Sequence, residues 1–306
     1  MKKTMVWLFT LMLVLVLPAT VKASSLQTSM IPENTRWLLH FDISKFFSTQ
    51  LGELLLNDET GKLNRANRKI AEAYKIDLLK DIGGITIFGP GKDKSKAVVA
   101  FSGNFNKDHL LSLLDKAETH QKIQYGKHTI HQWRHSQCGT FANDHLLLIG
   151  RDESTIKDVL DVMAGKKKSL TKGAMMSSIK EIPEDAFLKA VVDNIASLIK
   201  SDARTVLLKK TGMALFMALE KSGNLKLKLK LTTDTADTAQ NIEQMVRGLI
   251  ALARLKQQEE ADAEMKLIES LKITLKGNII QMELSYPSEE LVKVFSHGKE
   301  AMHLSF

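Results

Sequence analysis

Apolar residues recur along this chain with two different periods, and the alternation between them predicts an α+β fold. Short runs such as Trp37–Ile43 and Ala97–Phe101 are apolar over a few residues, as β-strands are. Longer stretches such as residues 152–163 carry apolar residues three and four positions apart, as along one face of a helix. Glycine, asparagine and proline separate these runs and predict turns. We therefore expect antiparallel sheets covered by helices.

The two halves of the chain repeat a similar order of strand, helices, hairpin, helix, hairpin and helix. Phe41-Asp42 ends the opening strand of the first half, as Val192-Asp193 does in the second. Lys122-Ile123-Gln124-Tyr125 likewise corresponds to Lys272-Ile273-Thr274-Leu275. The corresponding hairpins between these two matches are separated by a different number of residues than the matches are. A duplication therefore requires compensating insertions. Two similar β-rich units with an internal duplication are the working hypothesis.

The N-terminus has the three-part layout of a secretory signal peptide. Two lysines precede the apolar run Met5–Leu17, and small residues precede a cleavage point between Ala23 and Ser24. This run of 13 residues is shorter than the roughly 20 that a membrane-spanning helix needs. An uncleaved anchor is the alternative. We expect residues 1–23 to be removed and the mature chain to reach the periplasm or the extracellular space.

Composition indicates a globular chain without covalent cross-links. Hydrophobic residues make up 44% of the sequence, and Cys138 is the single cysteine, so no disulfide can form within the chain. Without the signal peptide, 40 basic and 35 acidic side chains leave a net charge of +5. Such a small excess gives weak support for a polyanionic partner. We expect a first α+β unit over residues 24–180 and a second over residues 181–306.

Three segments of the first half stand out as packing and turn motifs: Phe41-Asp42 at the end of the opening strand, the segment Leu78–Gly89, and the strand, turn and capped helix of Phe101–Leu114. In these segments the chain resembles a family of uncharacterised secreted bacterial proteins. The function of the family is unknown. The resemblance implies an exported, non-enzymatic protein and transfers no catalytic residue.

The densest group of possible metal ligands is His128, His131, His135 and Cys138. Strand alternation predicts that His128 and His131 point to opposite faces. His131 and His135 lie about 13 Å apart along a regular strand, and only a bend could bring them together. Cys138 has no adjacent base that would activate it as a nucleophile. A solvated, partly aromatic-packed strand is the favoured interpretation, and a metal or hydrolytic site near His131, His135 and Cys138 is the alternative.

Two further motifs suggest sites but have simpler explanations. His40 and Asp42 share one face of the opening strand and could act as an acid–base pair. No G-x-S-x-G segment completes a triad, so a surface polar pair or a helix cap by Asp42 is favoured. Gly89-Pro90-Gly91-Lys92 lacks the first glycine and the hydroxyl of a P-loop. A hairpin turn explains its glycines.

Leu225–Leu231 alternates leucine and lysine without interruption. Such a strand places its leucines in the core and Lys226, Lys228 and Lys230 on the other face, about 6.6 Å apart. These lysines either guard an exposed sheet edge or bind a polyanion such as lipid headgroups or envelope polysaccharide. The edge guard is favoured. Nucleic acid is not expected as a partner, because this face lacks aromatic residues for base stacking.

These observations identify no catalytic, cofactor-binding or metal-binding residue, and no cofactor is expected. The first functional hypothesis is an exported, non-catalytic binding or interaction module of the cell envelope. It would act through a sheet surface or the groove between the two halves, with another envelope protein or an anionic surface as partner. The alternatives are the metal or hydrolytic site and peripheral attachment to an anionic lipid or polysaccharide through the lysine strand.

Overall fold

The computed structural model describes residues 25–57, 61–117, 119–134, 137–195, 210–256 and 262–297. The expected signal peptide and the cleavage point between Ala23 and Ser24 lie outside these residues. The described strands are β1 (Trp37–Asp42), β2 (Ile82–Gly89), β3 (Val98–Gly103), β4 (Gln121–Tyr125), β5 (His128–Trp133), β6 (Gln137–Asn143), β7 (Leu146–Gly150), β8 (Leu188–Asp193), β9 (Thr211–Lys221), β10 (Asn224–Thr233), β11 (Lys272–Lys276) and β12 (Ile279–Pro287).

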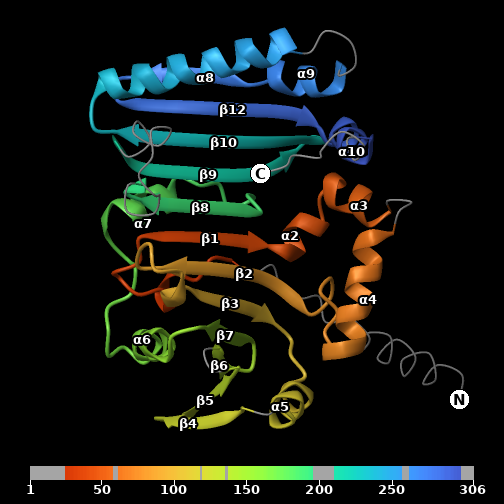
Figure 1. The fold of residues 1–306 in the computed structure, drawn as a ribbon, viewed down its shortest axis with the longest axis vertical. Coiled ribbons are helices and arrows are strands. Elements are labelled where there is room, and N and C mark those ends of the chain that lie inside the picture. Colours follow the sequence, from red (N-terminus) through yellow and green to blue (C-terminus); the bar gives the residue numbers. More distant parts are fainter. Residues whose placement is uncertain are drawn as a thin grey trace, which may run out of the picture.

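The described helices surround these strands (Figure 1). They are the short 3-10 helices η1 (Thr28–Met30) and η2 (Lys94–Lys96) and the α-helices α2 (Ile43–Phe47), α3 (Gln50–Leu56), α4 (Lys62–Tyr74), α5 (Lys107–Asp115), α6 (Glu153–Met163), α7 (Gly173–Lys180), α8 (Ala236–Lys256), α9 (Asp262–Glu269) and α10 (Ser288–His297). None of these helices is long and apolar enough to span a membrane.

All described strands form a single antiparallel sheet, in the order β11-β12-β10-β9-β8-β1-β2-β3-β7-β6-β5-β4. The α+β class is thereby confirmed, with one continuous sheet. The strands of the two predicted units meet at its centre, where β1 and β8 pair with Leu38 opposite Val191. From this pair β2 and β3 follow outward on one side, and β9 and β10 follow on the other. The internal duplication and the division into two units stay predictions.

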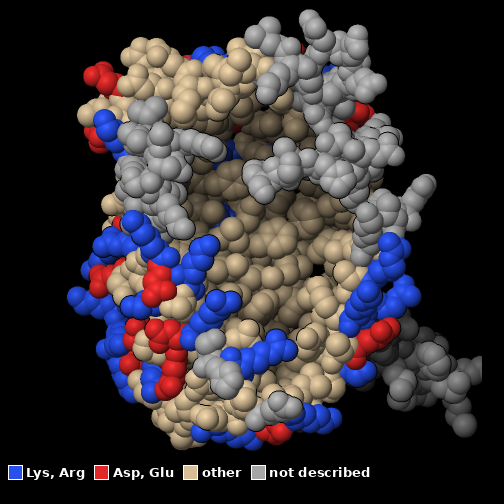
Figure 2. Space-filling view, viewed as in Figure 1, with Lys and Arg blue, Asp and Glu red and all other residues tan. Residues whose placement is uncertain are grey.

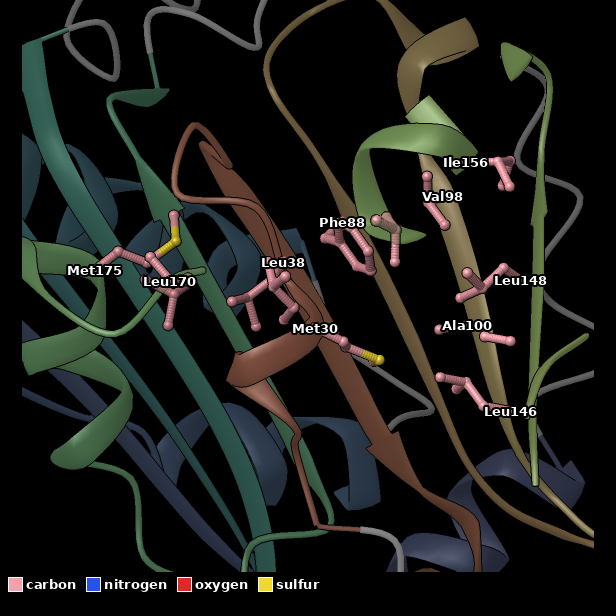
Figure 3. Packing of buried hydrophobic residues seen from close by; sticks show 14 of the residues in the cluster. Met30, Leu38, Phe88, Val98, Ala100, Leu146, Leu148, Ile156, Leu170 and Met175 are labelled. Atoms are coloured by element: carbon pink, nitrogen blue, oxygen red, sulfur yellow. The ribbon is translucent and has the colours of Figure 1, made fainter. Parts of the chain in front are cut away.

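One face of the sheet carries the largest core, and we call it the packed face. Leu38, Phe88 and Leu148 point from their strands into this core, each no more than 2% exposed. Helix α6 covers them with Ile156, and α7 covers β8 and β9 with Met175 (Figure 3). The predicted inward face of residues 152–163 is therefore confirmed for Ile156, Val159 and Leu160, whereas Met163 is 39% exposed.

Side-chain caps fix where several helices begin. Asp42 accepts a hydrogen bond from the backbone N–H of Lys45 at 2.9 Å, and Asn106 accepts one from His109 at 3.0 Å. Asp152 begins α6 by accepting from Ser154 at 2.8 Å. Each carboxylate or amide oxygen satisfies a backbone donor that the first helical turn leaves unpaired.

The helices on the opposite face surround its centre. Helix α8 packs over one end of the sheet, where Ile242 contacts Leu231 and Ile280. Helices α3 and α10 meet at the ends of the central strands, with Leu51 and Leu291 in one cluster. In Figure 1, α2, α3 and α4 line one side of this face and α5 lies near β4 and β5. The middle of the face lies between these helices.

Candidate binding site on the open face of the sheet

The central strands are apolar on both faces. In β3, Val98 and Ala100 point into the core and are at most 2% exposed, whereas Val99 and Phe101 point the other way and are partly exposed. In β7, Leu148 is buried while its neighbours Leu147 and Ile149 are partly exposed. Strands that are apolar on both sides are typical of sheets with both faces covered. On this sheet, the helices among the described residues cover one face and only the margins of the other.

Strand register aligns the exposed apolar side chains in rows across the sheet. One row follows successive cross-strand partners from Ile149 through Val99, Ile87, Leu39 and Ala190 to Phe216. A second row runs beside it through Leu147, Phe101, Ile85, Phe41 and Leu188. Directly opposed side chains of neighbouring strands are about 5 Å apart. The rows therefore form one continuous apolar surface.

We define the open floor as those partly exposed members that belong to none of the three buried clusters. It consists of Leu39, Ile85, Ile87, Val99, Phe101, Leu147, Ile149, Ala190 and Phe216. Figure 2 shows this side of the molecule as a hollow whose floor carries uncharged side chains. Contiguous apolar patches of this kind mark ligand grooves or interaction sites, because a monomer rarely leaves them open to water.

Aromatic side chains border the open floor where β1 ends. The ring of Phe41 lies 5.3 Å from that of Phe46 and 6.1 Å from that of Phe187.

At the start of β1, the Trp37 ring lies over Gly89, so close that a Cβ at Gly89 would be 2.8 Å from the ring. The Nε1–H of Trp37 donates to the carbonyl of Gly91 at 3.0 Å. Gly89 therefore leaves room for the tryptophan ring, and the carbonyl of Gly91 accepts its hydrogen bond.

Positive side chains stand on the rim of the hollow. In the view of Figure 2, Lys and Arg gather beside the hollow next to α4 and next to α6, with acidic side chains among them. On α4 the exposed residues include Arg65, Arg68 and Lys69. An apolar floor with cations at its margin suits a molecule that has both a hydrocarbon part and a polar or anionic part.

The structure separates the residues of the expected metal or hydrolytic site. His131 lies opposite Gly139 and Cys138 opposite Gln132, so the side chains of His131 and Cys138 are on different faces of the sheet. His135 lies outside the described residues. Burial raises the pKa of the Cys138 thiol to about 11, which keeps it protonated and unreactive. Throughout the described ranges, no three His, Cys, Asp or Glu side chains are arranged to hold a metal ion.

His131 has a different partner, which the sequence did not indicate. Nε2 of His120 lies 2.9 Å from Nδ1 of His131, and the rings are stacked with an angle of 11° between them. The other ring nitrogen of His120 lies 3.2 Å from Asp115. His120 stands between α5 and β4, outside any apolar pattern. His120 reaches His131 only because the register of the β4–β5 hairpin places Lys122, two residues after His120, opposite His131.

His40 and Asp42 do share one face of β1, but that face is the packed one. Both are 1% exposed, so the expectation of a surface pair is wrong. Nδ1 of His40 lies 2.9 Å from the hydroxyl of Thr86 on β2. Asp42 caps α2 and lies 3.4 Å from Nζ of Lys45, which confirms the alternative role as a helix cap. The hydrogen bonds to His40 and to Oδ1 of Asp42, together with the ion pair between Oδ2 of Asp42 and Lys45, offset the cost of burying these polar groups.

The lysine strand is β10, and it lies inside the sheet between β9 and β12. The edge-guard interpretation of Lys226, Lys228 and Lys230 is therefore wrong, since β10 has no free edge. Lys228 forms an ion pair with Glu283 at 2.8 Å, and Lys230 forms one with Glu181 at 2.6 Å. These partners neutralise much of the positive charge that the alternation predicts, and they lie on the face opposite the leucines.

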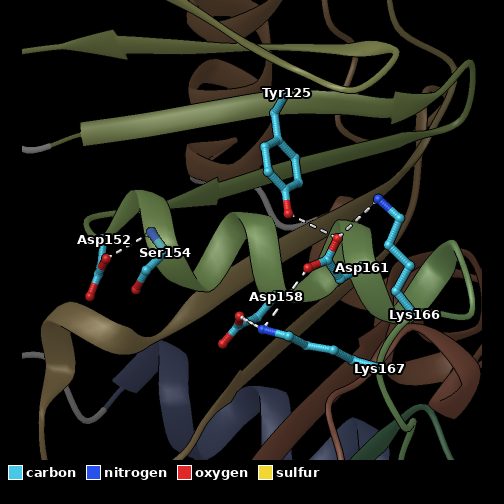
Figure 4. Close-up of polar contacts among 7 residues, drawn as sticks. All are labelled: Tyr125, Asp152, Ser154, Asp158, Asp161, Lys166 and Lys167. Atoms are coloured by element: carbon cyan, nitrogen blue, oxygen red, sulfur yellow. Dashed lines mark hydrogen bonds and ion pairs between the residues drawn. The ribbon is translucent and has the colours of Figure 1, made fainter.

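A polar network ties the edge of the sheet to α6 on the packed face (Figure 4). The hydroxyl of Tyr125 donates to Asp161 at 2.9 Å, and this hydrogen bond raises the pKa of Tyr125. Lys167 pairs with Asp158 at 2.5 Å, and Lys166 lies 3.7 Å from Asp161. Lys166 and Lys167, which follow the C-terminus of α6, therefore form ion pairs with acidic side chains of the same helix.

Comparisons with known proteins identify a fold and no family. No family model and no curated protein matches the chain. Among solved structures, crystal form III of TP0453 aligns with a TM-score of 0.50 and 11% identity, covering 90% of this chain and 99% of that one. Crystal form IV of TP0453 aligns with a TM-score of 0.50 and 12% identity, covering 90% and 98%. At this identity the likeness concerns the fold alone, which this chain shares with TP0453 over nearly the whole of that protein.

Proposed function

We propose that this chain is an exported, non-catalytic binding module of the cell envelope, and that the open floor holds the hydrocarbon part of an amphiphile. The observation that carries the proposal is the two-sided apolar character of the central strands. Leu38 and Leu148 bury one side in the core, while Leu39 and Ile149 leave the other side partly exposed. Covering that surface would remove apolar area from water, which stabilises a complex by about 25 cal/mol per Å².

Hydrocarbon suits the open floor better than an extended peptide does. The floor offers only aliphatic and aromatic side chains, and the backbone groups of β1, β2 and β3 already pair with neighbouring strands. A peptide backbone laid across them would leave N–H and C=O groups unpaired, at about 2–7 kcal/mol each in an apolar environment. An alkyl chain has no such groups. The occupant is therefore expected to be an acyl or similar chain.

The rim indicates the chemistry of the other end of the ligand. Arg65, Arg68 and Lys69 are exposed on α4, and Figure 2 places Lys and Arg beside the hollow. Cations there favour a carboxylate or phosphate over a neutral end group. A free fatty acid and a phospholipid share this chemistry.

Fluorescence titration with cis-parinaric acid tests the proposal. Ile87 lies in the middle of the open floor, so Ile87→Glu places a carboxylate where the chain would lie. We expect the Kd of the probe to rise at least about tenfold, because a charge against hydrocarbon costs more than 1.4 kcal/mol. The matched control is Met163→Glu, which introduces the same charge at a residue that is 39% exposed on α6.

Two further arms identify the ligand class. The methyl ester of cis-parinaric acid should bind more weakly than the acid at low salt, and this difference should shrink as salt rises. Competition by a fatty acid but not by a dispersed phospholipid would favour the free acid as occupant. Failure of the wild-type chain to bind the probe, or equal binding by the Ile87→Glu and Met163→Glu variants, would overturn the proposal.

Attachment through the lysine strand is a second candidate with a weaker basis. Lys228 and Lys230 already pair with Glu283 and Glu181. Replacing all three lysines Lys226, Lys228 and Lys230 by Gln should weaken binding to acidic vesicles if this candidate holds. Binding to acidic vesicles that does not weaken with added salt would exclude attachment through the lysine strand.

A further inference from the structure

The contact between His120 and His131 fastens one corner of the molecule. His120 immediately precedes the edge strand β4, and Asp115 ends α5. Both histidines are largely buried: the side chain of His120 is 7% exposed, and His131 is 8% exposed. The pair therefore joins the α5–β4 connection to β5 at a place that water scarcely reaches.

Hydrogen-bond geometry limits how many protons this pair can hold. Asp115 lies 3.2 Å from Nδ1 of His120, so that nitrogen carries a proton and donates it to the carboxylate. Nε2 of His120 and Nδ1 of His131 are 2.9 Å apart, which requires one proton between them. One added proton can bind to a ring nitrogen outside this contact, so the hydrogen bond between the rings persists. When both rings are fully protonated, two N–H groups face each other and the hydrogen bond is lost.

The charges around the pair oppose a second proton. Besides His120, the charged groups that act on His131 are Lys122, opposite it on β4, and Asp115 at the end of α5. One carboxylate cannot balance two imidazolium groups and a lysine. Burial, together with His120 and Lys122, lowers the pKa of His131 below its ordinary value. Forming the doubly charged pair therefore competes directly with keeping the contact closed.

We infer that the His120–His131 pair is a pH-sensitive latch, which holds the α5–β4 corner to β5 near neutral pH and releases it when both rings become protonated. Edge strand β4 pairs only with β5 in the described sheet, so once this contact is lost it detaches more easily than a central strand does. Tyr125, which donates to Asp161 at the other end of β4, would keep that end attached to α6. Release is then local, and the central strands stay paired.

This latch lies beyond one end of the open floor. His131 is followed across the sheet by Gly139 and then by Ile149, the last apolar member of the central row. The His120–His131 contact lies outside the open floor, so the latch works the same way whatever the floor binds.

Amide hydrogen exchange of the full mature chain between pH 7.5 and pH 5.0 tests the latch. After correction for the intrinsic exchange rate, we expect the protection factors of the β4 amides to fall at least about tenfold across this range. Such a change corresponds to a decrease of about 1.4 kcal/mol in the free energy of local opening. Protection of β1 and β2 should stay unchanged. In the His131→Asn variant the amide can still donate to His120 but does not titrate, so the response should disappear.

The control is His128→Asn, on the same strand with its side chain on the other face, and it should keep the response. Ring nitrogen NMR of the wild-type chain gives a second readout that needs no variant. At pH 7.5 the facing nitrogens should share one proton, and the loss of β4 protection should coincide with the appearance of a proton on each of them. Unchanged β4 protection in the wild-type chain, a pH response that survives in His131→Asn, or an intact shared proton at pH 5.0 would each overturn the latch.

Discussion

Leu38 and Leu39 are neighbours in β1, yet they point to opposite environments. Leu38 is 1% exposed and packs in the core opposite Phe88, whereas Leu39 lies opposite Ile87 on the open floor. Period-two alternation places one leucine on each side of the sheet. A strand that is apolar on both sides gains stability from the covered face and leaves apolar side chains on the open one. This division of the central strands is the basis of the proposed function.

The two faces should respond differently to the same truncation. Leu148 is fully buried, so Leu148→Ala should lower the free energy of unfolding by about 2–5 kcal/mol. Leu147 is its neighbour on the open floor, and Leu147→Ala should cost less than about 1.5 kcal/mol. Urea denaturation of the ligand-free chain measures both. Equal losses would mean that the floor is packed as tightly as the core.

Capping of α6 should contribute measurably to stability. Asp152 accepts a hydrogen bond from the backbone N–H of Ser154 at 2.8 Å, so Asp152→Ala leaves this donor unpaired. We expect a loss of about 1 kcal/mol, because α6 also covers the core. Asp152→Asn keeps an acceptor and should recover most of the loss. If the Asn and Ala variants unfold at the same urea concentration, the cap has no such role.

Stability should fall as the pH drops below the ordinary pKa of histidine. The folded chain lowers the pKa of His131, chiefly through burial, so the unfolded chain binds more protons in this range. The free energy of unfolding then increases with pH up to about 6.5 and loses this contribution as the pH falls. Denaturation midpoints of the wild-type chain and His131→Asn measure the effect. If the free energy of unfolding depends on pH as steeply in His131→Asn as in the wild-type chain, His131 does not cause this loss of stability.

The single cysteine should be inert in the folded protein. Cys138 is 2% exposed, and burial raises its thiol pKa to about 11. Iodoacetamide at pH 8 should therefore modify the native chain very slowly and the urea-unfolded chain fully. Mass spectrometry after a timed reaction distinguishes the two. Complete modification of the folded chain within minutes would show that Cys138 is accessible.

The sequence predicts the strands and helices better than it predicts their surroundings. Alternation in Leu225–Leu231 identifies the strand and the separation of leucine from lysine, but it cannot show whether the strand lies at an edge or inside the sheet. His40 and Asp42 look like a surface pair because local polarity does not reveal the packed face above them. Both outcomes depend on partners far away in the chain, such as β12 beside the lysine strand and Thr86 beside His40.

The candidate site was predicted only in part. A sheet surface was the expected place of interaction, but runs such as Val98–Phe101 are apolar on both sides whether or not helices cover them. Only the positions of the helices show which face stays open. The contact of His120 with His131 was missed for another reason. His120 belongs to no periodic segment, and it reaches its partner through the register of a hairpin.

Native mass spectrometry of the chain, purified from its own cells without detergent, shows whether the open floor holds an amphiphile. We expect a mass above that of the polypeptide by one amphiphile, which organic solvent releases. The Ile87→Glu variant should lack this amphiphile, and the Met163→Glu variant should retain it. A bare polypeptide mass for the wild-type chain, with no amphiphile in the solvent extract, would contradict the proposed function.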